Sequence, residues 1–184
     1  MFDHMHWFNP PAAWQINENH LNVTSAPKSD FWRRTHYGFI RDNGHFFFQE
    51  VRGDFIADIR VDGRYAALYD QAGLMLRVDE ENWIKTGIEY FEEQQHISAV
   101  VTRAFSDWSV APLPGNPPSL WLRVTRKAEA VEILYSLDGQ DYTLLRVAYL
   151  LPAEMTQVGP MCASPDGPGF EMTFIDFKIS PAYE

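Results

Sequence analysis

A two-residue alternation of apolar and polar side chains restricts the fold of this chain more than any other feature. In the segment 74–79, apolar residues alternate with Met75, Arg77 and Asp79. The segment 83–90 repeats the pattern, with isoleucines at every fourth position on one face. This period is typical of a β-strand with one buried face, and no stretch shows a convincing 3.6-residue repeat. The alternation therefore predicts an all-β chain.

The turn residues favour many short antiparallel strands. Asn43-Gly44 and Asp138-Gly139 lie between apolar runs and favour the positive φ of tight hairpins, and Asp62-Gly63 is a third candidate. The proline-rich segment 112–118 must be a loop because proline lacks the N–H that a ladder needs. The last strand, 170–179, loses its alternation near Ile175, which predicts a β-bulge. Together these signals predict an antiparallel β-sandwich or barrel.

Length and charge narrow the possibilities further. The 184 residues suit one domain, 1–184, with a core from about 14 to 180. The net charge of −10 predicts neither a nucleic-acid nor a membrane partner, since both are anionic. A single cysteine, Cys162, excludes an internal disulfide, and the first residues do not resemble a signal peptide. We therefore expect a cytoplasmic protein.

The alternation gives each predicted strand an inner and an outer face. The inner face contains Leu74, Leu76, Ile84, Ile88, Leu120, Leu122 and Val124. The outer face carries Met75, Arg77, Trp83, Lys85, Glu89, Trp121 and Arg123. If their strands are neighbours, flat rings and charged groups share a surface where rings stack on a sugar and charged groups bond its hydroxyls. The alternative is a solvated face with a few incidental rings.

Three further segments supply candidates close to this surface. Asp30 and Trp32 belong to a dense cluster and are placed at the rim of a groove, unless Phe31 and Trp32 cap the core. Tyr69 directly precedes a predicted strand, so its side chain is a candidate for the ligand-facing side. Trp108 is either a ring that stacks on the ligand or a plug of the core.

Signals for catalysis and metal binding are weak. A sandwich glycosidase typically alternates two carboxylates on one strand, and no Glu-x-Asp pattern occurs. Cys162 is predicted to be a small buried residue, and the grouping of Asp3, His4 and His6 is attributed to chance. We therefore predict no metal and no cofactor. A hydrolase would need two carboxyl groups facing each other across an aromatic-lined groove, one of them with a raised pKa.

Several blocks, taken together and in this order, resemble the DUF1349 family. They are 30–33 (DFWR), 69–74 (YDQAGL), 83–89 (WIKTGIE), 106–109 (SDWS) with 120–124 (LWLRV), and 158–165 (VGPMCASP). The resemblance implies a concanavalin A-like lectin/glucanase jelly roll with a concave sheet. The family name records an unknown function, some members are labelled regulators of enolase, and no catalytic residue is implied. The middle block is also similar to a sandwich module appended to some bacterial xylosidases.

Three functions remain open at this point. The first is a non-catalytic module that holds a carbohydrate or sugar-like small molecule on the concave sheet. The second is an intracellular regulatory module whose acidic surface steers it to a metabolic-enzyme partner. The third is a glycoside hydrolase or lyase with an unfamiliar carboxylate pair, and we expect it least.

Overall fold

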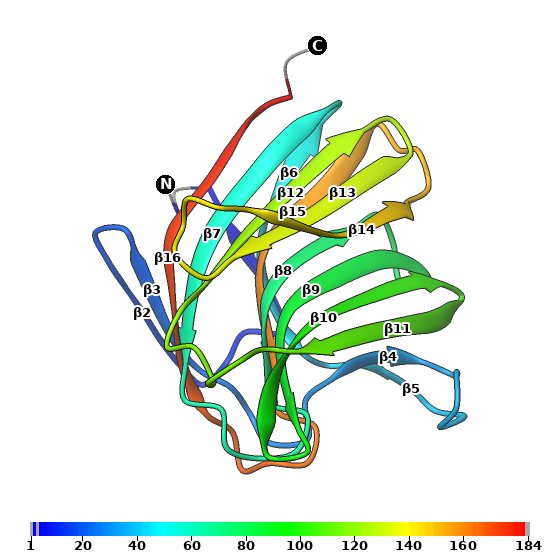
Figure 1. The fold of residues 1–184 in the computed structure, drawn as a ribbon. Helices are drawn as coiled ribbons and strands as arrows, with labels where there is room; N and C mark the ends of the chain where they lie inside the picture. The colour runs from blue at the N-terminus through cyan, green and yellow to red at the C-terminus, as the bar shows by residue number, and fades with distance from the viewer. Residues whose placement is uncertain (1, 3, 183–184) are drawn as a thin grey trace.

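The computed structural model describes residues 2 and 4–182 and contains two seven-stranded antiparallel sheets packed face to face (Figure 1). Sheet A has the order β1 (His6–Phe8), β6 (His45–Arg52), β15 (Met155–Ala163), β8 (Gln71–Arg77), β9 (Asn82–Phe91), β10 (Gln94–Arg103) and β11 (Phe105–Pro112). Sheet B has the order β14 (Thr143–Tyr149), β13 (Ala130–Ser136), β12 (Leu120–Lys127), β7 (Phe55–Gly63), β16 (Glu171–Pro181), β3 (His20–Thr24) and β2 (Ala13–Asn17). A separate hairpin pairs β4 (Phe31–Arg33) with β5 (Ile40–Asp42). The predicted all-β sandwich is confirmed.

The main core lies between the two sheets, as the alternation predicts. All seven residues assigned to the inner face are buried there, with exposed fractions of 0–2%: Leu74, Leu76, Ile84, Ile88, Leu120, Leu122 and Val124. Burial of these branched side chains is the main favourable term for the fold. The segment 113–118 separates β11 from β12, as predicted, but Pro112 belongs to the edge strand β11 and is in register with His96, so the predicted loop begins one residue later.

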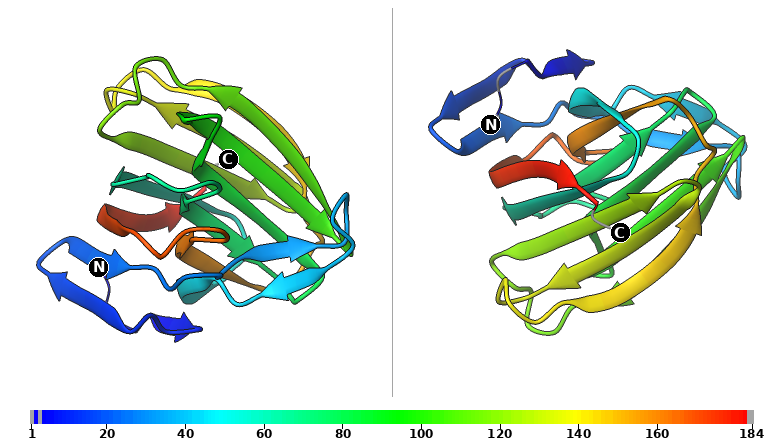
Figure 2. Two further views of the ribbon diagram at one scale, coloured as in Figure 1. Left: turned by 90° about the horizontal axis from the view of Figure 1, so that it is seen from below. Right: turned by 90° about the horizontal axis from the view of Figure 1, so that it is seen from above.

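A second core covers the opposite face of sheet A. The hairpin β4–β5 crosses this face, as both views in Figure 2 show, and its Phe31 is completely buried. The cluster contains Phe31, Trp32, Phe46, Met75, Trp83, Val100 and Met161. Sequence analysis assigned Met75 and Trp83 to an outer, ligand-accessible face, which is wrong, because the hairpin seals them.

Polar contacts hold this hairpin on the sheet. The backbone N–H of Arg33 donates to Ser106 Oγ at 2.9 Å, and its guanidinium pairs with Glu81 at 2.5 Å. Lys85 Nζ donates to the carbonyl oxygen of Phe31 at 2.7 Å. The hairpin is therefore anchored by two buried rings, those of Phe31 and Trp32, and by hydrogen bonds to two strands and a turn of sheet A.

The turn predictions have mixed outcomes. Asp138-Gly139 lies in the β13–β14 hairpin as predicted, with Gly139 at φ 77°. Asn43-Gly44 instead connects β5 to β6, which are not paired, and neither residue has a positive φ. Gly44 is needed for space, since a Cβ there would lie 2.3 Å from the Phe31 ring. The prediction of a hairpin at Asn43-Gly44 is wrong because a tertiary contact, not a turn type, selects this glycine.

Two further local predictions concern sheet B. Asp62-Gly63 ends strand β7 in register with β16, so it is not the turn that was predicted. The bulge near Ile175 is confirmed, because the register with β7 shifts between Ile175 and Lys178, and Asp176 has φ 55°. One strand thus changes the face that its side chains present without leaving the sheet.

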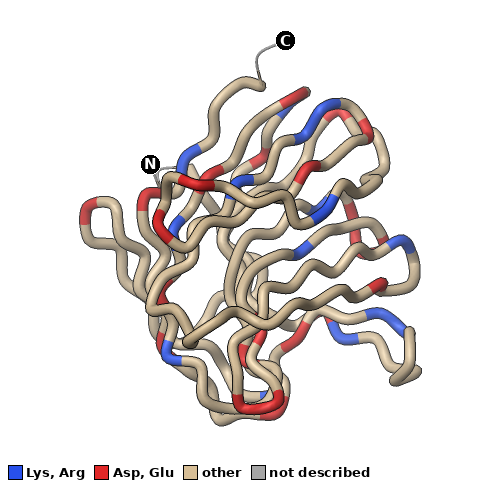
Figure 3. The backbone as a smooth tube through the Cα atoms, viewed as in Figure 1, with Lys and Arg blue, Asp and Glu red and all other residues tan. Residues whose placement is uncertain are grey.

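Acidic and basic residues are interspersed over strands and turns of both sheets (Figure 3). Acidic residues gather on several of the connecting turns, which agrees with the net charge of −10. Within residues 2 and 4–182, no helix has the length and apolar character that a membrane crossing requires.

We predict that Phe31→Ala lowers the free energy of unfolding by about 3–5 kcal/mol, because it empties a fully buried ring site. For a chain of this size that corresponds to a fall in Tm of roughly 6–20 °C in a thermal melt. The matched control is Phe105→Ala, whose ring is 56% exposed and should change stability by less than about 1 kcal/mol. Equal effects of the two variants would contradict a second core under the hairpin.

Candidate functional site

A pocket of about 190 Å³ opens between the hairpin β4–β5, the outer face of sheet A and the segment 165–166. Its lining residues are Asp30, Trp32, Tyr37, Phe39, Arg41, Tyr69, Gln71, Lys85, Glu89, Trp108, Pro165 and Asp166. The pocket forms because the hairpin covers only part of the sheet face. Its base is sheet A, and its walls come from segments distant in sequence.

Aromatic rings form the two side walls. On the hairpin side, Tyr37 packs edge-on against Trp32 at 5.6 Å and stacks on Phe39 at 5.4 Å between ring centroids. On the sheet side, Tyr69 lies edge-on to Trp108 at 6.3 Å. The hydroxyls of Tyr37 and Tyr69 are 3.0 Å apart and join the walls. This hydrogen bond, together with burial, raises the pKa of Tyr69 to about 12.

Two paired glycines lie in sheet A beside the pocket residues Lys85 and Glu89. Gly87 in β9 is paired with Gly73 in β8, and a Cβ at Gly87 would lie 2.1 Å from the Ala72 carbonyl oxygen. Lys85 and Glu89 precede and follow this glycine on the same face of β9. The close approach of the two backbones therefore excludes a side chain at the position between Lys85 and Glu89.

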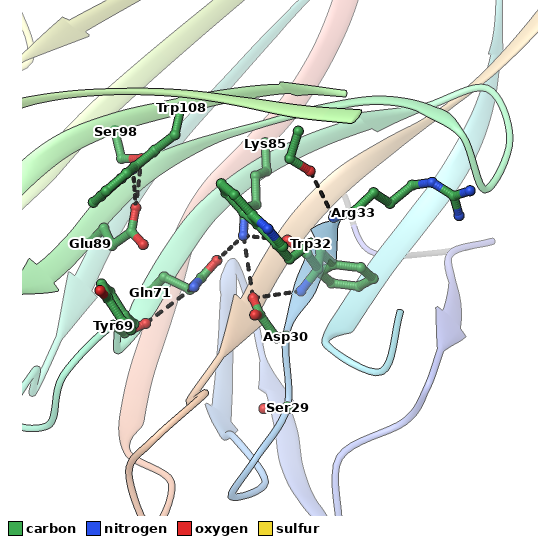
Figure 4. A network of polar contacts seen from close by, with 12 residues as sticks. Ser29, Asp30, Trp32, Arg33, Tyr69, Gln71, Lys85, Glu89, Ser98 and Trp108 are labelled. Atoms are coloured by element: carbon green, nitrogen blue, oxygen red, sulfur yellow. Dashed lines mark hydrogen bonds and ion pairs between the residues drawn. The ribbon is translucent and has the colours of Figure 1, made fainter. Parts of the chain in front are cut away.

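Lys85 is buried, and oxygen atoms of the protein surround its ammonium group. Its Nζ donates to the Phe31 carbonyl at 2.7 Å and to Gln71 Oε1 at 2.6 Å, and lies 3.5 Å from Asp30 Oδ1 (Figure 4). Asp30 Oδ1 also accepts the backbone N–H of Phe31 at 2.8 Å. A buried ammonium is tolerated only with such partners. Lys85 therefore fixes the position of Asp30 and of the hairpin that carries it.

Glu89 is buried with only one of its two carboxylate oxygens bound. Its Oε2 accepts hydrogen bonds from Ser98 Oγ and from Trp108 Nε1, each at 2.8 Å (Figure 4). No hydrogen bond from the described residues reaches Oε1. Burial raises the pKa of this carboxyl, whereas Lys85 and the two donors oppose the increase. Glu89 thus offers a vacant acceptor to the pocket that it lines.

The structure brings together most of the residues predicted to bind a ligand. Those that line the pocket are Asp30, Trp32, Tyr69, Lys85, Glu89 and Trp108. Trp32 belongs to the second core, not the sandwich core, and Trp108 packs against that second core, while both rings also line the pocket. Ligand binding itself stays a prediction for all of them.

Four predicted residues do not line the pocket. Arg77 is buried and forms two 2.8 Å hydrogen bonds to Asp42, and Trp83 lies beneath Phe31 at 6.3 Å. Trp121 and Arg123 are on β12 of sheet B, whose neighbours are β7 and β13. There Arg123 donates to Asp58 at 2.7 Å. The assumption that all these strands are neighbours is therefore wrong.

Sequence reasoning missed half of the pocket lining. The missed residues are Tyr37, Phe39, Arg41, Gln71, Pro165 and Asp166. Most lie on turns or on the short hairpin, where no periodicity marks an inward side chain. Gln71 belongs to a block already singled out, and its position at the start of β8 was the available signal.

The weak catalytic and metal signals can also be placed. Cys162 is fully buried, as predicted, and burial raises the pKa of its thiol. No cluster of three potential metal ligands occurs within the part of the chain that the structure describes. Asp3, one of the three terminal residues considered for a metal, lies outside that part.

Comparison with known proteins identifies the family. The chain matches the family described as "Protein of unknown function (DUF1349)" over residues 7–182, and it belongs to that family. It is 38% identical over 174 residues to "Regulation of enolase protein 1" of Saccharomyces cerevisiae, covering 95% of this chain and 88% of the relative. A crystal structure of a functionally unknown protein from the same yeast has a TM-score of 0.96 at 37% identity, covering 100% of this chain and 99% of that one.

More distant structures share the fold alone. A xylan β-1,4-xylosidase from Bacillus halodurans matches with a TM-score of 0.70 at 13% identity, over 96% of this chain but only 39% of the xylosidase. The carbohydrate-binding module CBM66 from Bacillus subtilis matches with a TM-score of 0.61 at 11% identity, over 95% and 94% of the two chains. The sandwich is thus a fold found both alone and as part of a larger enzyme.

We predict that Trp108→Phe raises the pKa of Glu89 further, because it keeps a ring but removes a donor that favours the carboxylate. The pKa is measured by following the side-chain carboxyl carbon by NMR across a pH titration. The control is Trp121→Phe, which lies in the other sheet and should leave the titration unchanged. A fall in the pKa of Glu89 in Trp108→Phe would contradict the hydrogen bond.

Proposed function

We propose that this DUF1349 domain is a non-catalytic module that binds a carbohydrate or sugar-like small molecule in the pocket beside the hairpin. One observation carries the proposal: aromatic walls surround buried carboxyl groups that have vacant acceptor oxygens. Rings such as Trp108 suit the C–H face of a sugar, and the free oxygens of Glu89 and Asp30 suit its hydroxyls. The fold shared with a carbohydrate-binding module supports the proposal as analogy.

The volume of the pocket limits the size of the ligand that it can hold. Its 190 Å³ is smaller than the roughly 300–1,000 Å³ of sites for drug-sized molecules. We infer that the pocket holds about one ring, so a longer glycan would insert one unit and lie outside with the rest. The pocket is also preformed, because Lys85 and the Tyr37–Tyr69 hydrogen bond hold its walls in place.

We predict that Trp108→Ala weakens binding of the best monosaccharide or glycan found in an array by about tenfold or more, or at least about 1.4 kcal/mol. Trp121→Ala is the matched control, because sequence analysis proposed that ring as well but the structure separates it from the pocket. Titration calorimetry measures both, with circular dichroism to show that each variant folds. Loss of affinity in Trp121→Ala with none in Trp108→Ala would move the site to sheet B.

A regulatory role is a second candidate, favoured by the name of the yeast relative. In that case an intracellular module would act on a metabolic enzyme, and its acidic surface would steer a basic partner. A pull-down that recovers one stoichiometric enzyme, from a protein that binds no glycan, would favour this function over sugar binding.

A hydrolase is favoured by one observation that the sequence analysis had required. Asp30 and Glu89 line the same aromatic pocket, and burial raises the pKa of Glu89. However, Oδ1 of Asp30 is already engaged, since it lies 3.5 Å from Lys85 Nζ and accepts the backbone N–H of Phe31. Release of reducing sugar from a bound glycan, lost in Glu89→Gln, would replace the binding function with a catalytic one.

A further inference from the structure

The pocket's free hydrogen-bonding groups are mainly acceptors, and we infer from this that its ligand is a sugar with a protonated amino group. This inference rests on the proposed function and specifies the class of sugar. It separates amino sugars from neutral sugars of the same shape, and from acidic sugars such as uronates.

Protein groups already engage donors of four lining side chains, namely Trp108, Trp32, Gln71 and Lys85. Trp108 Nε1 donates to Glu89 at 2.8 Å, and Trp32 Nε1 donates to the Thr35 carbonyl at 2.9 Å. Gln71 Nε2 donates to the Tyr69 carbonyl at 3.2 Å. Lys85 Nζ has three oxygen neighbours within 3.5 Å. An anionic ligand would therefore depend on Arg41 and on the one hydroxyl proton that the Tyr37–Tyr69 hydrogen bond leaves free.

The acceptors, by contrast, stay available. Glu89 uses Oε2 and Asp30 uses Oδ1 for the hydrogen bonds and ion pair described above, which leaves Oε1 and Oδ2 without a bond from the described residues. Asp166 adds an exposed carboxylate at the mouth. Three carboxyl groups thus line the pocket against two cations, Lys85 and Arg41.

The aromatic walls favour the same ligand. The face of an aromatic ring carries negative charge and attracts an ammonium group, most strongly where water is excluded. Four rings with polar edges, those of Trp32, Tyr37, Tyr69 and Trp108, surround the space beside Glu89. A protonated amine placed there would donate to Oε1 of Glu89 while it contacts ring faces. Lys85 opposes the rise in the pKa of that carboxyl which burial causes, but its hydrogen bonds go to Phe31 and Gln71, so Oε1 of Glu89 stays free for the ammonium group.

Matched pairs of sugars test the inference. Titration calorimetry at pH 7 compares D-glucose with D-glucosamine, D-galactose with D-galactosamine and D-mannose with D-mannosamine, and adds D-glucuronate as the acidic probe. We expect the amine of at least one pair to bind about tenfold tighter than its neutral partner, since hydrogen bonds to charged groups are the stronger ones. Glucuronate should bind more weakly than glucose.

Variants assign the preference to the pocket. Glu89→Gln should bring the amine close to its neutral partner, and Asp166→Asn, at an exposed position, should reduce the preference without affecting the fold. Glu93→Gln, on the exposed β9–β10 turn, is the control and should keep the full preference.

The outcomes separate this inference from the proposed function. Equal binding within every pair, or tighter binding of glucuronate, overturns the amine preference and leaves sugar binding in place. No binding by any member of the panel removes the proposed function and the inference together. A preference unchanged in both Glu89→Gln and Asp166→Asn would overturn the role given to these carboxylates.

Discussion

The burial of the second face of sheet A under a two-stranded hairpin is the constraint on which the site depends. A sandwich needs only one buried face on each sheet, and the outer face ordinarily meets solvent. Here Phe31 inserts between the hairpin and the sheet, above Trp83, and Gly44 leaves room for its ring. Because the hairpin is short, it covers only part of this face. The edge of the hairpin forms one wall of the pocket. The pocket is thus a consequence of incomplete coverage.

The charged residues of β9 are hard to explain by stability. Lys85 and Glu89 are 5% and 7% exposed, and each must be compensated by hydrogen bonds. Replacing such buried ions with apolar residues often leaves a protein as stable or more stable. The structure provides Lys85 with oxygen neighbours but binds only one oxygen of Glu89. Their cost is consistent with the proposed role in recognition, and the free oxygen of Glu89 makes it the residue best placed to contact a ligand in this pocket.

The alternation predicted the inner face correctly because the period of two is a property of each strand by itself. It could not predict which outer faces adjoin, since that depends on the pairing of strands. Trp121 occupies an outer-face position in the alternation, as Trp83 does. However, its strand β12 pairs with β7 and belongs to the other sheet. Trp83 also occupies an outer-face position in the alternation, and that pattern does not indicate that a hairpin covers this residue. Tyr37 and Phe39 lie in irregular chain, where only tertiary packing decides the direction of a side chain.

The same architecture couples the pocket to the stability of its own wall. Phe31, Lys85 and the Tyr37–Tyr69 hydrogen bond all connect the hairpin to the sheet, and each lies at or beside the pocket. A molecule that contacts both walls adds connections of the same kind, so its binding energy favours the closed arrangement over any state with the hairpin detached. The sandwich core contributes little to this equilibrium, since its residues face the opposite side of sheet A. The shape of the pocket is therefore set by the hairpin and its neighbouring turns, and not by the sandwich core.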